Sequence, residues 1–300
     1  MRWDSVGGVF QGFERVRVDV GGVDVHAVVG GTGPPVLLLH GFPQTRAMWH
    51  PVAPALARRA TVVAADLRGY GDSGVPPAGP DHAGYSFRAT AADQVGLMRA
   101  LGHERFAVVG HDRGARTAHR MALDHPGAVT RAAVLDILPT LHVYTHLDQA
   151  LATAYYHWFF FLQPADLPER LIGADPIGYL HTLLAGWGSG LGAFAPEALA
   201  EYERCFADPE RRHAMLEDYR AAASIDLEHD RADLHRRVEV PLLALWGARS
   251  VVARSPVDPL DVWRERGTDV RGATVDAGHF LVEERPAETR AELERFLWDG

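Results

Sequence analysis

Apolar and polar residues alternate along positions 15–29, and the pair Gly21-Gly22 interrupts the alternation. A period of two is that of a strand with one buried face, and paired glycines favour a tight turn. The next apolar run, Val36 to Leu39, is continuous, which is typical of a parallel strand covered on both faces. The pattern therefore predicts an antiparallel hairpin followed by a buried parallel strand.

Further strands and helices are predicted along the chain. Short continuous apolar runs occur at 61–65, 106–109, 132–135 and 242–246. Apolar residues recur at helical spacing over 48–59, 90–101, 115–125 and 287–298. Because strands alternate with helices, we expect an α/β fold with a mostly parallel sheet flanked by helices.

The alternation lapses between residues 140 and 236. This stretch is aromatic-rich, and prolines divide it into short helical patterns without strand-like periodicity. We expect it to be an α-helical cap inserted into the sheet domain. The predicted organisation is a first core part at 1–139, the cap at 140–236 and a second core part at 237–300.

One strand runs directly into Gly110-His111-Asp112-Arg113-Gly114 and then into a helix. This is the nucleophile-elbow pattern, with aspartate where esterases carry serine, so a serine esterase is excluded. A carboxylate nucleophile displaces a leaving group from saturated carbon and forms an ester that water then hydrolyses. Asp112 is the predicted nucleophile, and His111 is expected to be a structural hydrogen-bonding residue.

Two other segments fit the same chemistry. His40-Gly41-Phe42-Pro43 follows the first core strand, where the backbone N–H groups of Phe42 and Arg113 would form an oxyanion hole. Asp276-Ala277-Gly278-His279-Phe280 lies between a short strand and the last helix. That context makes His279 the predicted general base.

Two arginines accompany the nucleophile, Arg113 beside it and Arg116 three residues further on the same helical face. Guanidiniums there would bind a substrate carboxylate and screen its repulsion from Asp112. The chain contains neither lysine nor asparagine, so all 30 cationic side chains are arginine. Lysine chemistry such as Schiff-base formation is therefore excluded. The predicted substrate is a small anion.

These segments resemble the α/β-hydrolase superfamily over nearly the whole chain, and residues 112–116 are similar to the Asp-Arg-x-x-Arg signature of fluoroacetate dehalogenases. The resemblance implies that three cap residues, His157, Trp158 and Tyr219, donate hydrogen bonds to the departing halide. It also implies a homodimer.

The acid that orients His279 has several candidates. Many superfamily members carry it after the penultimate core strand, where this chain has Ser250. Asp258 and Asp261 follow in a proline-rich loop, and Asp136 ends an earlier core strand as in fluoroacetate dehalogenases. Asp136 is the predicted partner.

The leading hypothesis is hydrolysis of a 2-haloacetate, with fluoroacetate preferred, to glycolate and halide. An epoxide hydrolase is the enzyme alternative. It usually needs two cap tyrosines, and we expect only one of the adjacent Tyr155 and Tyr156 to point inward. A catalytically silent, carboxylate-binding protein of the same fold is the third hypothesis. Trp187 could gate the pocket, but packing is the favoured interpretation.

Composition limits the partners. The net charge of −9 argues against nucleic acid, and the single cysteine, Cys205, excludes an internal disulfide. No apolar stretch suits a signal peptide or a membrane span, so we expect a cytoplasmic enzyme. Nothing suggests a metal or an organic cofactor. In Asp66 to Ser73 we expect Arg68 and Asp72 to form a structural ion pair.

Overall fold

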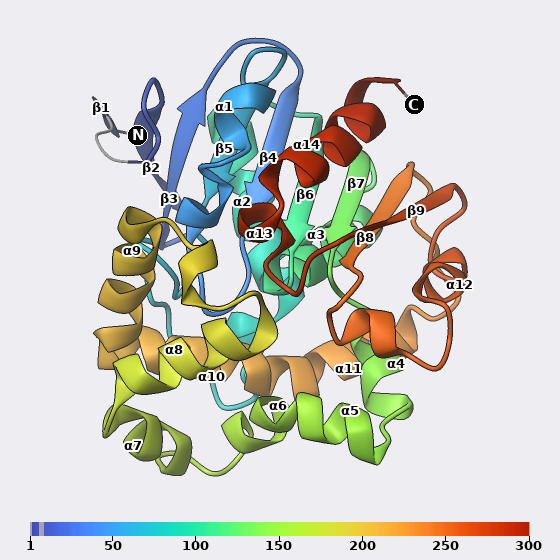
Figure 1. The fold of residues 1–300 in the computed structure, drawn as a ribbon. Coiled ribbons are helices and arrows are strands. Elements are labelled where there is room, and N and C mark those ends of the chain that lie inside the picture. The colour runs from blue at the N-terminus through green and yellow to red at the C-terminus, as the bar shows by residue number, and fades with distance from the viewer. Residues whose placement is uncertain (1, 6–8, 300) are drawn as a thin grey trace.

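The computed structural model describes residues 2–5 and 9–299. Nine strands in this part form one sheet with the order β1-β2-β3-β5-β4-β6-β7-β8-β9 (Figure 1). The strands are β1 (Arg2–Ser5), β2 (Glu14–Val20), β3 (Val23–Gly30), β4 (Pro35–Leu39), β5 (Thr61–Ala65), β6 (Phe106–His111), β7 (Val129–Leu135), β8 (Leu242–Gly247) and β9 (Val270–Val275). The first three pair antiparallel, and β3 joins β5 antiparallel, whereas the rest of the sheet is parallel.

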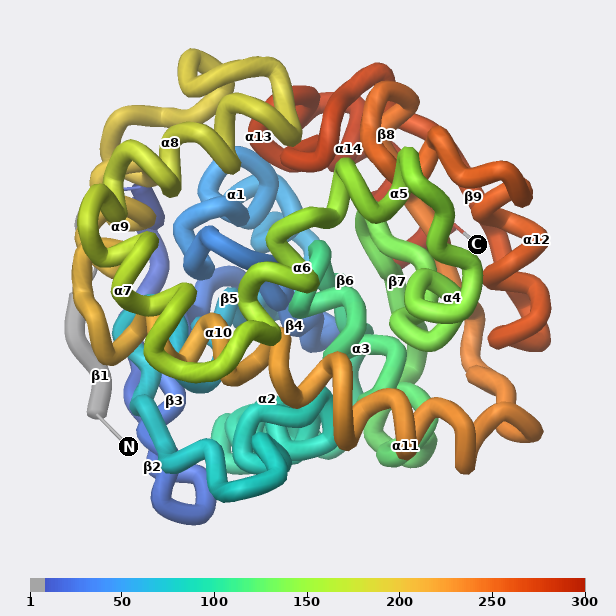
Figure 2. The backbone as a smooth tube through the Cα atoms, turned by 90° about the horizontal axis from the view of Figure 1, so that it is seen from below, coloured from blue at the N-terminus to red at the C-terminus, as the bar shows by residue number. Residues whose placement is uncertain are grey.

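Helices cover both faces of the sheet (Figure 2). One face carries α1 (Ala53–Leu56), α13 (Leu281–Glu284) and α14 (Pro286–Glu294). The other carries α2 (Phe87–Ala100) and α3 (Arg113–Asp124), and His119 of α3 packs against Trp263 of α12 (Pro259–Arg264). This layered arrangement confirms the expected α/β class.

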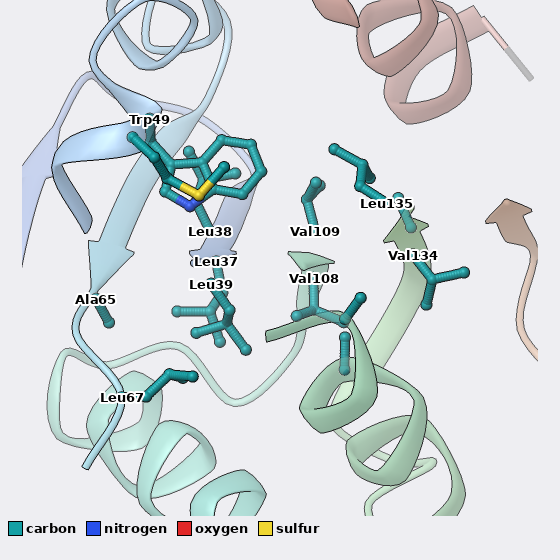
Figure 3. Close-up of a cluster of buried hydrophobic side chains, with 14 of the residues drawn as sticks. Leu37, Leu38, Leu39, Trp49, Ala65, Leu67, Val108, Val109, Val134 and Leu135 are labelled. Atoms are coloured by element: carbon teal, nitrogen blue, oxygen red, sulfur yellow. The ribbon is translucent and has the colours of Figure 1, made fainter. Parts of the chain in front are cut away.

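The core lies where the central strands meet these helices. Leu37, Leu38 and Leu39 of β4 and Val108 and Val109 of β6 are fully buried, and their side chains lie close together in Figure 3. Both faces of a parallel sheet are covered, so neither set of alternate residues meets water. The continuous apolar runs follow from that geometry.

The cap is helical and lies between β7 and β8 in the sequence. It comprises α4 (Thr140–Thr145), α5 (Gln149–Ala154), α6 (Tyr156–Phe161), α7 (Leu167–Gly173), α8 (Pro176–Trp187), α9 (Pro196–Ala207), α10 (Pro209–Ala223) and α11 (Ile225–Ala232). Figure 1 shows these helices gathered across the end of the sheet at which the parallel strands finish. Ligand sites of open α/β sheets lie at that end.

The remaining turns are short. They are the 3-10 segments Arg46–Trp49, Ala83–Tyr85, Leu191–Ala193 and Val252–Arg254, and the π-helical turn Arg295–Asp299 that ends the last helix. Within the described residues no helix combines the length and apolarity needed to cross a membrane.

Two local predictions were wrong. The helix expected over 48–59 is a 3-10 turn and the short α1, because Pro51 and Pro54 interrupt the hydrogen-bond ladder that a continuous helix requires.

The expected Arg68–Asp72 pair is not formed either. Arg68 donates to Asp93 on α2 at 2.6 and 2.7 Å, whereas Asp72 accepts from Arg46 at 2.8 Å and from Arg204 at 2.7 Å. Each group reaches a partner far along the chain in preference to its near neighbour.

Candidate active site

Asp112 lies on a sharp turn between β6 and α3. Its backbone has φ 47° and ψ −111°, a conformation that side chains other than glycine rarely adopt. A Cβ on Gly110 would lie 2.2 Å from the carbonyl oxygen of Gly114, and one on Gly114 would lie 2.4 Å from that of His40. The two flanking glycines are therefore required by close backbone contact, and the turn lifts Asp112 above the sheet.

The Asp112 carboxylate is held at one oxygen. Its Oδ1 accepts a hydrogen bond from the backbone N–H of Phe42 at 2.9 Å. Burial raises the pKa of this carboxyl, but the nearby charges of His279 and Arg113, with smaller contributions from His111 and Arg116, lower it below its ordinary value. Asp112 is thus ionised at neutral pH, and no described residue donates a hydrogen bond to its Oδ2.

His279 faces that free oxygen. Its Nε2 lies 4.0 Å from Asp112 Oδ2, and its Nδ1 lies 2.6 Å from Oδ2 of Asp136. Asp136, at the end of β7, also accepts the N–H of Gly247 at 2.9 Å. Burial lowers the pKa of His279, but the hydrogen bond and charge of Asp136 and the charge of Asp112 raise it above its ordinary value. The structure therefore brings the predicted nucleophile, base and orienting acid together.

A cavity of about 210 Å³ opens above these groups. Core and cap residues line it, among them Asp112, Arg116, Asp136, Tyr155, His157, Trp158, Trp187, Tyr219, Arg249, Ser250, Arg254 and His279. Sequence reasoning had assigned no role to Arg249 or Arg254. Arg249 follows β8 and Arg254 ends a 3-10 turn. Only the fold shows that these two loop residues border the cavity.

The two predicted carboxylate-binding arginines differ in their surroundings. Arg116 lines the cavity, and its Nη1 donates to the carbonyl of Leu138 and to Thr140 Oγ1, both at 2.9 Å. Its Nε is buried and has no hydrogen-bond partner among the described residues. Arg116 is therefore fixed in place with an unused donor.

Arg113 is held by Asp218, a residue to which the sequence assigned no role. It donates from Nε and Nη2 to the Asp218 carboxylate at 2.8 and 2.6 Å, and its guanidinium lies 4.3 Å from the ring of Tyr219. It is not among the cavity-lining residues, and only its Nη1 is without a partner in the described part of the chain. The carboxylate of Asp218 balances the charge of Arg113. The helical pattern of the sequence could not predict this ion pair, because the two residues are 105 positions apart.

The three predicted halide donors lie together. The ring of Tyr219 is 5.8 Å from that of His157 and 6.2 Å from that of Trp158. All three residues are buried and line the cavity, and neither the Tyr219 hydroxyl nor the indole N–H of Trp158 donates to another described residue. Burial lowers the pKa of His157 to about 3, so its imidazole is neutral near pH 7.

Similarity to known proteins shows the family of the chain. Residues 34–286 match the family model described as alpha/beta hydrolase fold. A fluoroacetate dehalogenase from Burkholderia sp is 51% identical to the chain over 97% of this chain and 96% of that protein. The chain belongs to the fluoroacetate dehalogenase family of the α/β hydrolases.

Other relatives of this dehalogenase-family chain are also informative. A soluble epoxide hydrolase from Corynebacterium sp. (strain C12) is 33% identical over 89% of the chain and 91% of its own length. The crystal structure of a protein from Nostoc sp PCC 7120, assigned to the alpha/beta hydrolases, superposes with a TM-score of 0.94. It is 54% identical and covers 96% of this chain and 99% of that one.

The competing acid candidates lie elsewhere in this dehalogenase-family fold. Asp258 caps α12 by accepting the N–H of Leu260 at 2.9 Å, and Asp261 pairs with Arg264 at the surface. Ser250 lines the cavity but carries no charge.

The aromatic residues of uncertain role are also placed. Tyr155 lines the cavity whereas Tyr156 is 44% exposed, as expected of two adjacent positions. Trp187 is a cavity wall, with its ring 4.5 Å from that of His157, so the favoured interpretation of simple packing was incomplete. His111 lies beneath, with Nε2 2.8 Å from the carbonyl oxygen of His279, which is the structural role expected of it.

Within the described residues, no group of three or more His, Cys, Asp or Glu side chains is arranged to hold a metal ion.

Proposed function

We propose that this protein hydrolyses 2-haloacetates, with fluoroacetate the preferred substrate, to glycolate and halide. The observation that carries the proposal is the buried guanidinium of Arg116, which shares one small cavity with the ionised Asp112. A cation with an unused donor beside a carboxylate nucleophile suits a substrate that carries its own carboxylate. The Burkholderia relative, a fluoroacetate dehalogenase, supports the same substrate class.

The first step is a displacement. Oδ2 of Asp112 attacks the carbon that bears the halogen, the carbon–halogen bond breaks, and the halide leaves with the bonding electrons. Oδ1 stays on the N–H of Phe42. Arg116 binds the substrate carboxylate from the cavity wall, and Arg113, although it does not line the cavity, contributes its positive charge. Fluoride leaves water at a high cost, so His157, Trp158 and Tyr219 replace its hydration shell with fixed donors.

The second step hydrolyses the ester. His279 Nε2 removes a proton from a water molecule, and the resulting hydroxide attacks Cγ of Asp112. Negative charge develops on Oδ1, where the N–H groups of Phe42 and Arg113 stabilise it. The intermediate collapses, the former Oδ2 departs with the glycolate, and the proton held by His279 neutralises the new alkoxide. Asp112 keeps the hydroxyl that came from water and releases its remaining proton to solvent, which restores the carboxylate. Asp136 stabilises the protonated imidazole in between.

Fluoride release from fluoroacetate is the direct test. Wild-type protein should release fluoride and glycolate in equal amounts, and Asp112→Ala should release neither. His279→Asn should release one equivalent of fluoride and retain a carboxymethyl ester on Asp112, visible by intact-protein mass spectrometry. Absence of halide release from fluoro-, chloro- and bromoacetate alike would overturn the proposal.

Epoxide hydrolysis is the second candidate, because Tyr155 and Tyr219 both line the cavity and could polarise an epoxide oxygen together. The two functions separate on Arg116. A neutral epoxide has no carboxylate, so turnover of styrene oxide that survives Arg116→Met would favour this candidate.

The assembly and location of the protein belong to the same proposal. By family resemblance we propose a homodimer, which light scattering of the purified protein would test. We also propose a cytoplasmic location, which fractionation of the source cells would test.

A further inference from the structure

The carboxylate of Glu284 accepts the backbone N–H groups of the two residues on either side of His279. Its Oε2 accepts the N–H of Gly278 at 2.9 Å, and its Oε1 accepts the N–H of Phe280 at 3.0 Å. Glu284 lies on α13, and its side chain is 0% exposed. A buried carboxylate must be hydrogen-bonded to be tolerated, and here its acceptors are used on the segment that carries the base.

The cap also makes a backbone contact with residues 278–280. The N–H of His279 donates to the carbonyl of Trp187, the last residue of α8, at 2.9 Å. A Cβ on Gly278 would lie 2.8 Å from that carbonyl oxygen and 2.9 Å from Cα of Gly188. Three consecutive N–H groups, those of residues 278–280, are therefore fixed by Glu284 and the cap, outside any helix or strand.

Glu284 also reaches the cap directly. The hydroxyl of Ser189, two residues beyond α8, donates to its Oε2. The guanidinium of Arg249, which lines the cavity, lies 3.9 Å from the same oxygen. One buried carboxylate thus connects the base segment, the end of α8 and the cavity wall.

We infer that Glu284 is a positioning residue for His279: it fixes residues 278–280 so that Nε2 faces Asp112 Oδ2, and it ties that position to the cap through Ser189. This inference rests on the proposed function, because the reaction separates the steps that do and do not use His279. Displacement of halide needs only Asp112 and the substrate-binding groups. Hydrolysis of the ester needs a correctly placed base, so a loss of positioning should slow the second step alone.

Electrostatics add to the argument from geometry. Burial lowers the pKa of His279, whereas Asp136, Asp112 and, to a lesser extent, Glu284 raise it. Removing the charge of Glu284 would therefore make His279 a weaker base as well as a less well-placed one.

Glu284→Gln is the informative substitution, since glutamine has the same size but its NH2 group would face one of the two N–H donors. Fluoride release in a single turnover, steady-state kcat and intact mass should be measured together. Fluoride should appear in the first turnover at the wild-type rate, whereas kcat per folded site should fall about 10- to 100-fold, within or just below what a general base contributes. The ester on Asp112 should accumulate. Ser189→Ala should give the same signature more weakly.

Glu283→Gln is the matched control. Glu283 is the adjacent residue and is also buried, but its carboxyl accepts from Tyr202 at 2.9 Å and from Gln44, not from the base segment. Burial raises its pKa to about 8, so at neutral pH the substitution removes little charge. This variant should keep kcat within a few-fold of wild type and should accumulate no ester.

The outcomes separate the two proposals. If wild-type protein releases no halide, the proposed function fails. If wild type releases halide and Glu284→Gln turns over equally fast without ester, Glu284 does not position the base. A fall in first-turnover fluoride that matches the fall in kcat would likewise overturn the inference, because it would indicate general loss of the folded site.

Discussion

Replacing Arg116 by methionine tests whether this arginine recognises the substrate by its charge. The side chain is 3% exposed, and its guanidinium carbon lies 4.7 Å from the ring centre of Trp158. Methionine keeps an unbranched apolar stem against that ring and removes the positive charge and the unused Nε donor. The perturbation is therefore confined to the cation that the proposed mechanism places on the substrate carboxylate.

The expected loss in kcat/KM follows from the hydrogen-bond donors of Arg116 that remain available to the substrate. Nη1 is already used by Leu138 and Thr140, so the substrate gains at least one bond from the rest of the guanidinium. A hydrogen bond to a charged group contributes roughly 1.5–3 kcal/mol. At about 1.4 kcal/mol for each factor of ten, kcat/KM for a haloacetate should fall about 10- to 150-fold.

The assay compares bromoacetate with neutral bromoacetamide, which carries the same leaving group without the charge. Arg116→Met should lower kcat/KM for bromoacetate much more than for bromoacetamide. Arg120→Met is the control, because Arg120 lies about one turn later on α3 and pairs with Asp124, Asp230 and Asp233 outside the cavity. It should lower thermal stability without changing the preference. An unchanged preference in Arg116→Met, or an equal change in Arg120→Met, would refute the assignment.

Three further predictions concern pH, the leaving group and the core. Because the pKa of His279 is raised, kcat should be lost as the pH falls through a value above the ordinary 6.5. Asp136→Asn should lower kcat and move this acid limb of the pH profile to lower pH. An acid limb that does not move would contradict the pairing of Asp136 with His279. Tyr219→Phe should slow fluoroacetate turnover by about tenfold, one net hydrogen bond, and bromoacetate turnover by less, because bromide is less strongly hydrated; equal losses would argue against a halide role. Leu37→Ala, at a fully buried position of β4, should lower the free energy of unfolding by roughly 2–5 kcal/mol in urea titrations, and a change below 1 kcal/mol would contradict the core assignment.

Much of the architecture could be read from local pattern. The continuous apolar runs predicted β4 to β8 to within a few residues, because a strand buried on both faces has no polar position. The elbow could also be predicted, because its tight turn leaves no room for a Cβ at Gly110 and Gly114, two residues before and after Asp112. In residues 48–59 the apolar spacing predicts one helix, but Pro51 and Pro54 in the same segment divide it into two short turns.

Residue identity and order along the chain were therefore sufficient to predict the parallel strands, the helices between β7 and β8, and the elbow that carries Asp112, Arg113 and Arg116. Only the tertiary structure shows that Oδ2 of Asp136 lies 2.6 Å from Nδ1 of His279 and that Asp258 caps a helix instead. It alone paired Arg113 with Asp218, 105 residues away, and placed Arg116 at the cavity with its Nε unpartnered among the described residues. The physical reason is that short-range pattern reports which face of an element is buried, whereas the charge and reach of a site depend on side chains that the fold brings together from distant parts of the chain.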